Sequence, residues 1–345
     1  MLEEKEGFNM KITMKHLRML GVTAAAILVI IFLPWQHGPK HPLRGGLVIL
    51  RPNAVGLGAR PIISGKKSNI AVEVPQSAKL FDHKVAVIMY HHIDPKLQNE
   101  DTITPELFAS QLDELTQNHM QFISLNQFRS FMKGGSVPAN AVLVTFDDGY
   151  ESFYKYAYPI MKKRHISGVC FVITGDLTPR ALVFTPHMTP EEIRDMTQRD
   201  PDMEVQAHTD DLHFKVNRGH DGLTGFLIVN GKKETKQQYI TRINQDIKAC
   251  VQKLLPLNRH AIDTFAYPYG LHNSSSIRVL QANGIHYAFT TKPGLSTTAM
   301  NLMLLPRING GSPHITPQAL YQSIRNAATP TLTFMGSLLE MLKPA

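Results

Sequence analysis

From residue 81 onward, short β-branched runs alternate with amphipathic helical stretches, and this alternation predicts an α/β fold with a parallel sheet. About seven such units favour a closed or nearly closed parallel barrel, with an open doubly wound sheet as the alternative. The chain has 345 residues, enough for one or two domains, and its 43% hydrophobic content excludes disordered, collagen-like and coiled-coil classes. We therefore expect a globular α/β protein.

The boundaries of the expected elements come from apolar runs and helix caps. Thr104 offers an N-cap with Pro105 at the first helical position, and Thr189 to Glu192 forms a capping box. A glycine- and lysine-rich segment at 215–236 interrupts the alternation. Strands are expected at 85–90, 141–146, 168–173, 203–207, 263–267 and 286–290, and further helices at about 151–164, 240–247 and 274–282.

Met19 to Trp35 is an apolar run of seventeen residues without a charge, at the short end of what a membrane-spanning helix needs. Basic residues before it, and no clear small-x-small cleavage site after it, favour an uncleaved signal anchor over a removed signal peptide. The proline-containing stretch that follows is typical of a tether. We expect a cytoplasmic tail over 1–18, the transmembrane anchor over 19–35, an extracytoplasmic linker over 36–80, the globular domain over 81–325 with its motifs from 141, and a C-terminal tail over 326–345.

Charge and cysteine content exclude several classes of protein. The chain carries 36 basic and 28 acidic residues, a net charge of +8 that suits an anionic membrane or cell-wall surface, but no Lys/Arg cluster indicates nucleic acid. Neither a Gly-x-Gly-x-x-Gly fingerprint after the first strand nor a Walker loop is present, which argues against dinucleotides and nucleoside triphosphates. Cys170 and Cys250 are expected to be buried thiols, with a disulfide as the alternative.

Two adjacent carboxylates, Asp147 and Asp148, directly follow the strand at 141–146, at the strand end where α/β folds place their sites. Neighbouring side chains on an extended backbone diverge. One carboxylate could therefore bind a cation while the other takes a proton from the water that this cation activates. Gly149 allows the sharp turn, and an ordinary Asp-Asp-Gly turn is the alternative.

His208 and His213 follow the strand at 203–207 in the same way. Two imidazoles and one carboxylate make a three-ligand set that leaves positions open for water, as a catalytic metal requires. A chance pair of surface or core histidines is the alternative for this motif alone. Zinc is favoured by the two imidazoles, but cobalt, nickel or iron would accept the same ligands.

Two further strand ends carry candidate groups. Pro268 and Gly270 bend the chain around Tyr269, so a backbone N–H there could donate to an oxyanion, although a tight capping loop is equally compatible with the motif. Arg307, in Leu305-Pro-Arg-Ile308, could orient one of the two carboxylates and lower its pKa.

These motifs resemble those of the polysaccharide deacetylases, the carbohydrate esterase family 4-like group built around the NodB homology domain, over roughly residues 85–308. The most specific motif is Thr-Phe-Asp-Asp-Gly-Tyr at 145–150, and the His-Thr-x-x-x-His spacing is similar to the exported branch that deacetylates poly-N-acetylglucosamine. The resemblance implies an irregular (β/α)7 barrel. It also implies that Asp147 is the catalytic base, that Asp148, His208 and His213 bind the metal, and that the amide of Tyr269 holds the oxyanion.

The sequence departs from the family pattern in two places. The third motif of many relatives begins with an arginine that pairs with the base, but Phe265-Ala-Tyr267 stands here, and Arg307 is the expected substitute. The late Leu-x-Leu-His motif that supplies the general acid in many relatives is absent, and His314 is the nearest candidate in sequence. His91 and His92, after the first strand, are expected to pack or to support the site rather than to bind metal.

The leading hypothesis is a membrane-tethered, metal-dependent hydrolase that removes N-acetyl groups from an extracytoplasmic glycan containing N-acetylglucosamine. A weakly active or non-catalytic glycan-binding barrel that lacks the general acid is the main alternative, and a phosphohydrolase with an aspartyl nucleophile is a distant one. Expected partners are the glycan and, through the N-terminal helix, the cell membrane, with no nucleic acid. The residues leave open whether the glycan is peptidoglycan, a chitin-like oligomer or an exopolysaccharide, and whether the bond cleaved is an amide or an ester.

Overall fold

The structure is a computed structural model that describes residues 79–96, 99–177 and 185–329 of the chain. The expected membrane anchor and nearly all of the expected linker lie outside these residues. Within the part that is described, no helix combines the length and apolar character that crossing a bilayer requires.

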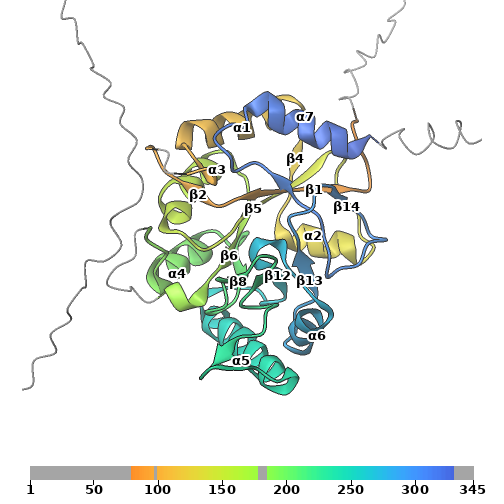
Figure 1. Cartoon of the computed structure of the whole chain (residues 1–345). Coiled ribbons are helices and arrows are strands. Elements are labelled where there is room, and N and C mark those ends of the chain that lie inside the picture. Colours follow the sequence, from red (N-terminus) through yellow and green to blue (C-terminus); the bar gives the residue numbers. More distant parts are fainter. Residues whose placement is uncertain (1–78, 97–98, 178–184, 330–345) are drawn as a thin grey trace, which may run out of the picture. The chain divides into compact units, whose positions relative to one another are not determined.

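Strands and helices alternate along the chain as expected (Figure 1). The central strands are β1 (Val85–Tyr90), β5 (Ala141–Phe146), β6 (Gly168–Val172), β7 (Met203–Ala207), β12 (Thr264–Ala266) and β13 (Tyr287–Phe289). The helices are α1 (Pro105–Gln117), α2 (Leu125–Met132), a π-helix (Phe153–Ala157) continued by α3 (Tyr158–Lys163), α4 (Pro190–Arg199), α5 (Lys236–Leu254), α6 (Ser274–Ala282) and α7 (Pro317–Ala328). Shorter strands are β2 (His92–Ile93), β3 (Thr102–Ile103), β4 (Gln121–Phe122), β8 (Lys215–Asn217), β9 (His220–Asp221), β10 (Ile228–Val229), β11 (Lys232–Lys233), β14 (Leu295–Ser296) and β15 (Ile308–Asn309).

The expected strands at 85–90, 141–146 and 203–207 match β1, β5 and β7 residue for residue. Thr104 and Thr189 cap α1 and α4, with proline at the start of each helix. The segment that interrupts the alternation forms two small hairpins, β8–β9 and β10–β11. Helix α7 continues to Ala328, beyond the domain boundary expected at 325.

The central sheet curls on itself. Its strands follow the order β13-β12-β7-β6-β5-β1, each parallel to its neighbours. The segment 305–309 lies between the two edges, because Leu305 bridges to Phe289 at the end of β13 while β15 pairs with Ile88 and Met89 of β1. This arrangement is consistent with the expected (β/α) barrel rather than with an open sheet.

Both faces of the sheet are buried, as parallel strands with continuous apolar runs require. On β1, Ala86, Ile88 and Tyr90 pack in the cluster that includes the helices α1 and α5, whereas Val85 and Val87 pack in a second cluster with residues of α2. In Figure 1, α1 and α7 lie side by side at one end of the sheet, and α5 and α6 lie at the other. Cys170 and Cys250 are buried free thiols, so the disulfide alternative is wrong.

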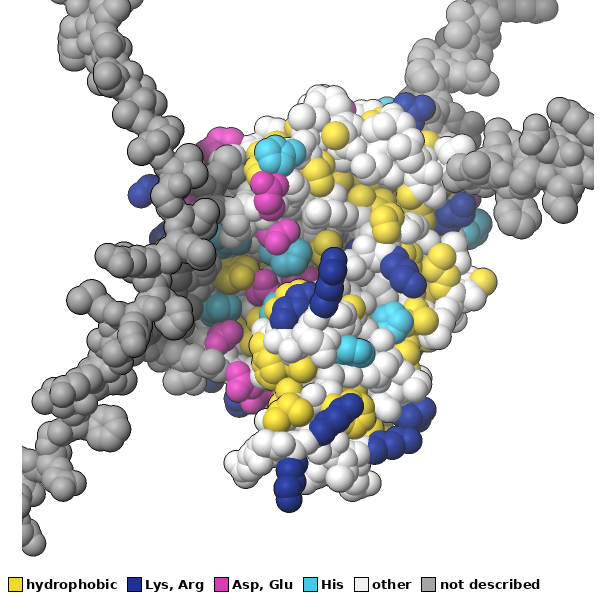
Figure 2. Space-filling view, in the orientation of Figure 1, with side chains coloured by type: hydrophobic (Ala, Val, Ile, Leu, Met, Phe, Trp, Pro, Cys, Tyr) yellow, Lys and Arg dark blue, Asp and Glu magenta, His cyan; other side chains and the backbone are white. Residues whose placement is uncertain are grey.

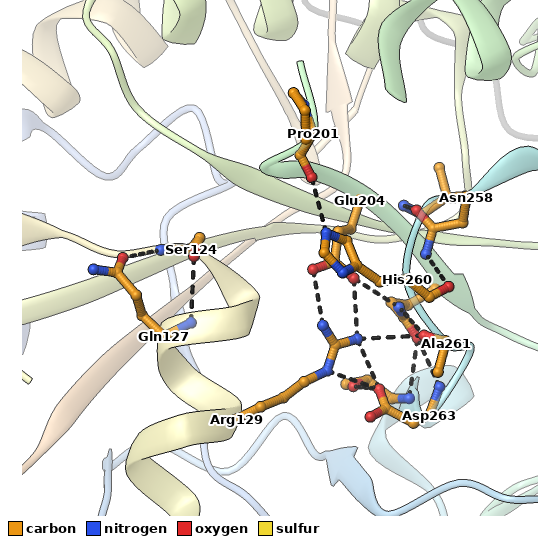
Figure 3. A network of polar contacts seen from close by, with 12 residues as sticks. Ser124, Gln127, Arg129, Pro201, Glu204, Asn258, His260, Ala261 and Asp263 are labelled. Atoms are coloured by element: carbon orange, nitrogen blue, oxygen red, sulfur yellow. Dashed lines mark hydrogen bonds and ion pairs between the residues drawn. The ribbon is translucent and has the colours of Figure 1, made fainter. Parts of the chain in front are cut away.

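A buried ionic network joins α2 to the strands (Figure 3). Arg129 donates to both carboxylate oxygens of Glu204, at 2.8 and 3.0 Å, and to Asp263 Oδ1 at 2.7 and 2.9 Å. Glu204 is the second residue of β7, and Asp263 directly precedes β12. The network therefore lies at the amino ends of these strands, opposite the edge that carries the motif loops.

We expect Arg129→Met to lower the free energy of unfolding by about 3–5 kcal/mol, because Glu204, only 1% exposed, would keep a buried charge without its partner. Adding Glu204→Gln should restore part of this loss. Denaturant unfolding followed by circular dichroism measures both effects.

The matched control is Arg164→Met, since Arg164 makes the same two-pronged contact with Asp113 at 2.7 and 2.8 Å but at a much more exposed position. Its loss should change the unfolding free energy by about 1 kcal/mol or less. Equal losses for Arg129 and Arg164 would contradict the importance of the buried network.

Candidate active site

Each of the three loops at the carboxyl ends of β5, β7 and β12 contains one non-glycine residue in the left-handed backbone region. These residues are Asp148 (φ 73°), Thr209 (φ 75°) and Tyr269 (φ 55°). Such angles are uncommon outside glycine, and for a β-branched residue like threonine they are genuine outliers. Strained residues persist only where the surroundings fix them, and they gather at functional sites. Here they mark one rim of the sheet.

Asp148, His208 and His213 are brought together at this rim. Asp148 Oδ1 lies 3.3 Å from His208 Nε2 and 3.4 Å from His213 Nε2, and one ligand atom from each residue falls within 4.8 Å of the others. Asp148 Oδ1 is buried and has no hydrogen-bond partner among the described residues. A divalent cation bound between the two imidazoles and this oxygen would supply the missing partner, so the donor set fits a metal with open positions.

A hydrogen bond from Nδ1 fixes the orientation of the His208 ring and leaves Nε2 available as a ligand. Nδ1 lies 2.7 Å from the carbonyl oxygen of Ala266, which accepts the Nδ1 proton and leaves the Nε2 lone pair directed at the site. Burial lowers the pKa of His208, but the carboxylates of Asp148 and Asp147 and the carbonyl of Ala266 together outweigh burial and raise it overall. Burial and the nearby His208 lower the pKa of His213 to about 4, so His213 is neutral at physiological pH.

Asp147 is held by Arg307 and points to a different partner from Asp148. The guanidinium donates from both terminal nitrogens to the two carboxylate oxygens, each at 2.7 Å. Arg307 is 1% exposed, and its Nε donates to the carbonyl of Thr290 at 3.0 Å. Burial would raise the pKa of Asp147, but Arg307 outweighs burial and holds it below the usual range. Asp147 therefore stays ionised beside Asp148, His208 and His213, the three metal-binding candidates.

His91, expected in a packing or supporting role, lies beside Asp147. Its Nε2 is 3.9 Å from Asp147 Oδ2, and its Nδ1 is buried without a hydrogen-bond partner in the described part of the chain. His314, the candidate acid from sequence, is instead 77% exposed in its side chain and pairs with the exposed Glu100 at 3.2 Å. Local sequence does not show that His91 and Asp147 are neighbours. They are neighbours because Tyr90, the last residue of β1, pairs with Phe146, the last residue of β5.

The loop after β12 forms another wall. Gly270 has φ 70°, and a Cβ there would lie 2.3 Å from Thr291 Oγ1, so the turn requires glycine. The ring of Tyr269 lies 4.6 Å from the ring of His213, and Lys215 Nζ lies 3.7 Å from the centre of the Tyr269 ring. The turn thus places the Tyr269 side chain next to a metal-binding candidate.

A cleft of about 390 Å³ opens onto two of the metal-binding candidates, Asp148 and His213. Figure 2 shows acidic and histidine side chains gathered in the middle of the face, with lysine and arginine side chains beside them. The cleft is lined by Asp148, Tyr150, Ile173, Asp176, His187, Asp211, His213 and Phe214.

Asp246 of α5 holds the loop between the two histidines from behind. Its carboxylate oxygens accept hydrogen bonds from the backbone N–H groups of Asp210, at 2.9 Å, and Asp211, at 2.7 Å. Burial raises the pKa of Asp246 to about 6. Because both histidines flank these two amides in sequence, Asp246 fixes the spacing of the imidazoles.

Asp246→Ala should weaken the affinity of the protein for Zn²⁺ by about 10- to 100-fold, as the loss of an outer partner does in other metal sites. Titration calorimetry of the metal-free protein measures this. Gln245→Ala, at an exposed neighbouring position on α5, is the matched control and should leave the affinity unchanged. An unchanged affinity in Asp246→Ala would show that the loop keeps its shape without this carboxylate.

Comparisons with known proteins agree with this geometry. Residues 134–288 match the family model described as polysaccharide deacetylase. The chain is 28% identical over 207 residues, 60% of its length, to the poly-β-1,6-N-acetyl-D-glucosamine N-deacetylase of Staphylococcus aureus strain MSSA476, and covers 67% of that protein. The Staphylococcus epidermidis protein of the same name is 27% identical over 207 residues.

Solved structures show the same fold. A de-N-acetylase from Aggregatibacter actinomycetemcomitans superposes with a TM-score of 0.61 at 22% identity, over 70% of this chain and 99% of that one. IcaB from Ammonifex degensii superposes with a TM-score of 0.58 at 25% identity, over 72% of this chain and 98% of that one.

Proposed function

This chain belongs to the polysaccharide deacetylase family, and from that premise we propose that it removes N-acetyl groups from a poly-β-1,6-N-acetyl-D-glucosamine-type polysaccharide with the help of a bound divalent metal ion. One observation carries the proposal: a three-ligand cluster, Asp148, His208 and His213, stands directly beside an ionised carboxylate, Asp147. The name of the staphylococcal relatives supports the choice of glycan.

Amide hydrolysis needs an activated water, a polarised carbonyl and a place for the developing negative charge. A divalent cation held by Asp148, His208 and His213 would polarise the acetyl oxygen and lower the pKa of water. Zinc suits two imidazoles and one carboxylate, and cobalt, nickel or iron would accept the same ligands.

The protein's own residues supply the remaining steps. Asp147, kept ionised and oriented by Arg307, accepts the proton of the attacking water. The backbone N–H of Tyr269 donates to the oxyanion of the tetrahedral intermediate. We assign the general acid to His91 rather than to His314, because His91 lies 3.9 Å from the base whereas His314 pairs with Glu100. It would protonate the departing glucosamine nitrogen.

A proton donor beside the base favours an active enzyme over the non-catalytic barrel that the missing family motif suggested. For location, we propose a single-pass membrane protein with residues 19–35 as the anchor and the deacetylase domain outside the cytoplasm. The apolar run and its basic flank in the sequence support this topology.

Asp148→Ala should abolish bound metal and acetate release together, because it removes one ligand of three. Asp147→Asn should keep the metal but lower kcat by about 10²- to 10⁴-fold, the usual contribution of a positioned base. Metal analysis and an acetate assay on β-1,6-linked N-acetylglucosamine oligomers measure both. Parallel assays on chitin oligomers and peptidoglycan fragments test the glycan, and acetate release by a metal-free Asp148→Ala protein would refute the mechanism.

His91→Ala should lower kcat for the glycan by about 10²-fold or more while bound metal stays unchanged, since amine departure needs a proton. Hydrolysis of 4-nitrophenyl acetate should change far less, because nitrophenolate leaves without one. His314→Ala is the control and should behave like the unaltered enzyme. If His314→Ala lost glycan activity and His91→Ala kept it, the assignment of the acid would be reversed.

A further inference from the structure

The hairpin β10–β11 presents two aliphatic side chains to solvent outside the motif loops. Ile228 is 67% exposed and Val229 is 53% exposed. Asn230 and Gly231 join the strands with φ of 51° and 73°, the two left-handed residues of a tight hairpin turn. Two large aliphatic side chains are therefore exposed next to each other in sequence at one hairpin tip.

Lysines accompany the aliphatic residues on both faces of the hairpin. Ile228 pairs with Lys233, and Val229 pairs with Lys232. Directly opposed residues of an antiparallel pair point to the same face. Each face of the tip therefore carries one aliphatic side chain and one lysine.

The base of the hairpin is firmly fixed to α5. The carboxylate of Glu234 accepts two hydrogen bonds from Arg242, at 2.7 and 3.0 Å, and one from the backbone N–H of Leu227 at 2.9 Å. Arg242 also donates to the carbonyl of Gly222 at 2.6 Å. The ring of Phe226, close to the Lys233 ammonium, packs 4.8 Å from the ring of Tyr239. The exposed tip thus extends from a base that is fixed to α5.

The charge around the tip is positive. Residues 226–242 contain four basic side chains and one acidic side chain, Glu234, which Arg242 pairs with. Lys232, Lys233 and Lys236 are exposed. Figure 2 shows basic side chains at the end of the molecule where α5 lies, and acidic ones mainly in the middle of the face.

Aliphatic residues flanked by lysines suit the surface of an anionic bilayer, which has an apolar acyl region beneath a layer of negatively charged headgroups. Aliphatic tips enter the boundary between headgroups and acyl chains, while the long lysine side chains keep their ammonium groups among lipid phosphates. A carbohydrate would instead call for aromatic and hydrogen-bonding groups, and a purely electrostatic surface would not need Ile228 and Val229.

We propose that the tip of this hairpin inserts into the surface of an anionic phospholipid membrane and so fixes the orientation of the deacetylase domain. The inference rests on the proposed membrane tether, because two aliphatic residues alone bind lipid only weakly. A tether raises the local concentration of lipid around the tip and makes a weak second contact effective.

The test uses the full chain in vesicles of phosphatidylcholine with or without phosphatidylglycerol. Val229→Cys is labelled with an environment-sensitive nitrobenzoxadiazole dye, which spares the buried Cys170 and Cys250. We expect a blue shift of emission and quenching by spin-labelled lipids in the phosphatidylglycerol vesicles. Leu255→Cys, 51% exposed at the far end of α5, is the matched control and should show neither.

Lys232→Glu with Lys233→Glu on the labelled chain should abolish the shift, because the lipid charge then repels the tip. No shift at position 229, or the same shift at 229 and 255, would overturn the proposal. Cross-linking of two copies of the Val229→Cys protein through the introduced thiol in detergent would also overturn it, by assigning the tip to a contact between protein chains.

Acetate release from soluble oligomers separates this inference from the proposed function. Ile228→Ser with Val229→Ser should release acetate at the unaltered rate and lose the lipid contact, as reported by a dye at position 232. An unaltered protein that releases no acetate while its tip enters the lipid would reject the deacetylase assignment but keep the membrane contact.

Discussion

The buried pair of Asp147 and Arg307 is the interaction on which the rest of the site depends. A carboxylate in a dry pocket would take up a proton and lose its basicity, and a guanidinium there would be costly without a partner. Two hydrogen bonds of 2.7 Å from Arg307 keep Asp147 ionised and at the same time give the buried guanidinium a charged partner. The same arginine bonds to the carbonyl that follows β13, so the position of the base is tied to the closure of the sheet.

The metal-binding candidates depend on the backbone in a similar way. Left-handed residues turn the chain sharply at three strand ends, and the packed sheet beneath them holds these turns in place. Hydrogen bonds to the carbonyl of Ala266 and to the carboxylate of Asp246 then fix ring orientation and loop shape. The fold thus prearranges the ligands, which limits the reorganisation that binding requires.

Local signals in the sequence predicted much of this. Apolar runs and caps located the strands and helices, and the motifs at strand ends named Asp147, Asp148, His208 and His213, which the structure brings together. The role proposed for His91 depends on the register between β1 and β5, which pairs distant segments and cannot be read from local sequence. The sequence did not predict the network of Arg129, Glu204 and Asp263, because isolated charged residues in a sequence carry no sign that they are buried.

The closing segment has a consequence for biosynthesis. Arg307 lies 160 positions after its carboxylate partner, and the strand that seals the sheet follows directly behind it. A nascent chain that already contains both histidines still lacks Arg307, whose positive charge keeps Asp147 ionised. The proposed hydrolytic activity would therefore arise only when translation has passed this point, and a chain that ends earlier would lack it.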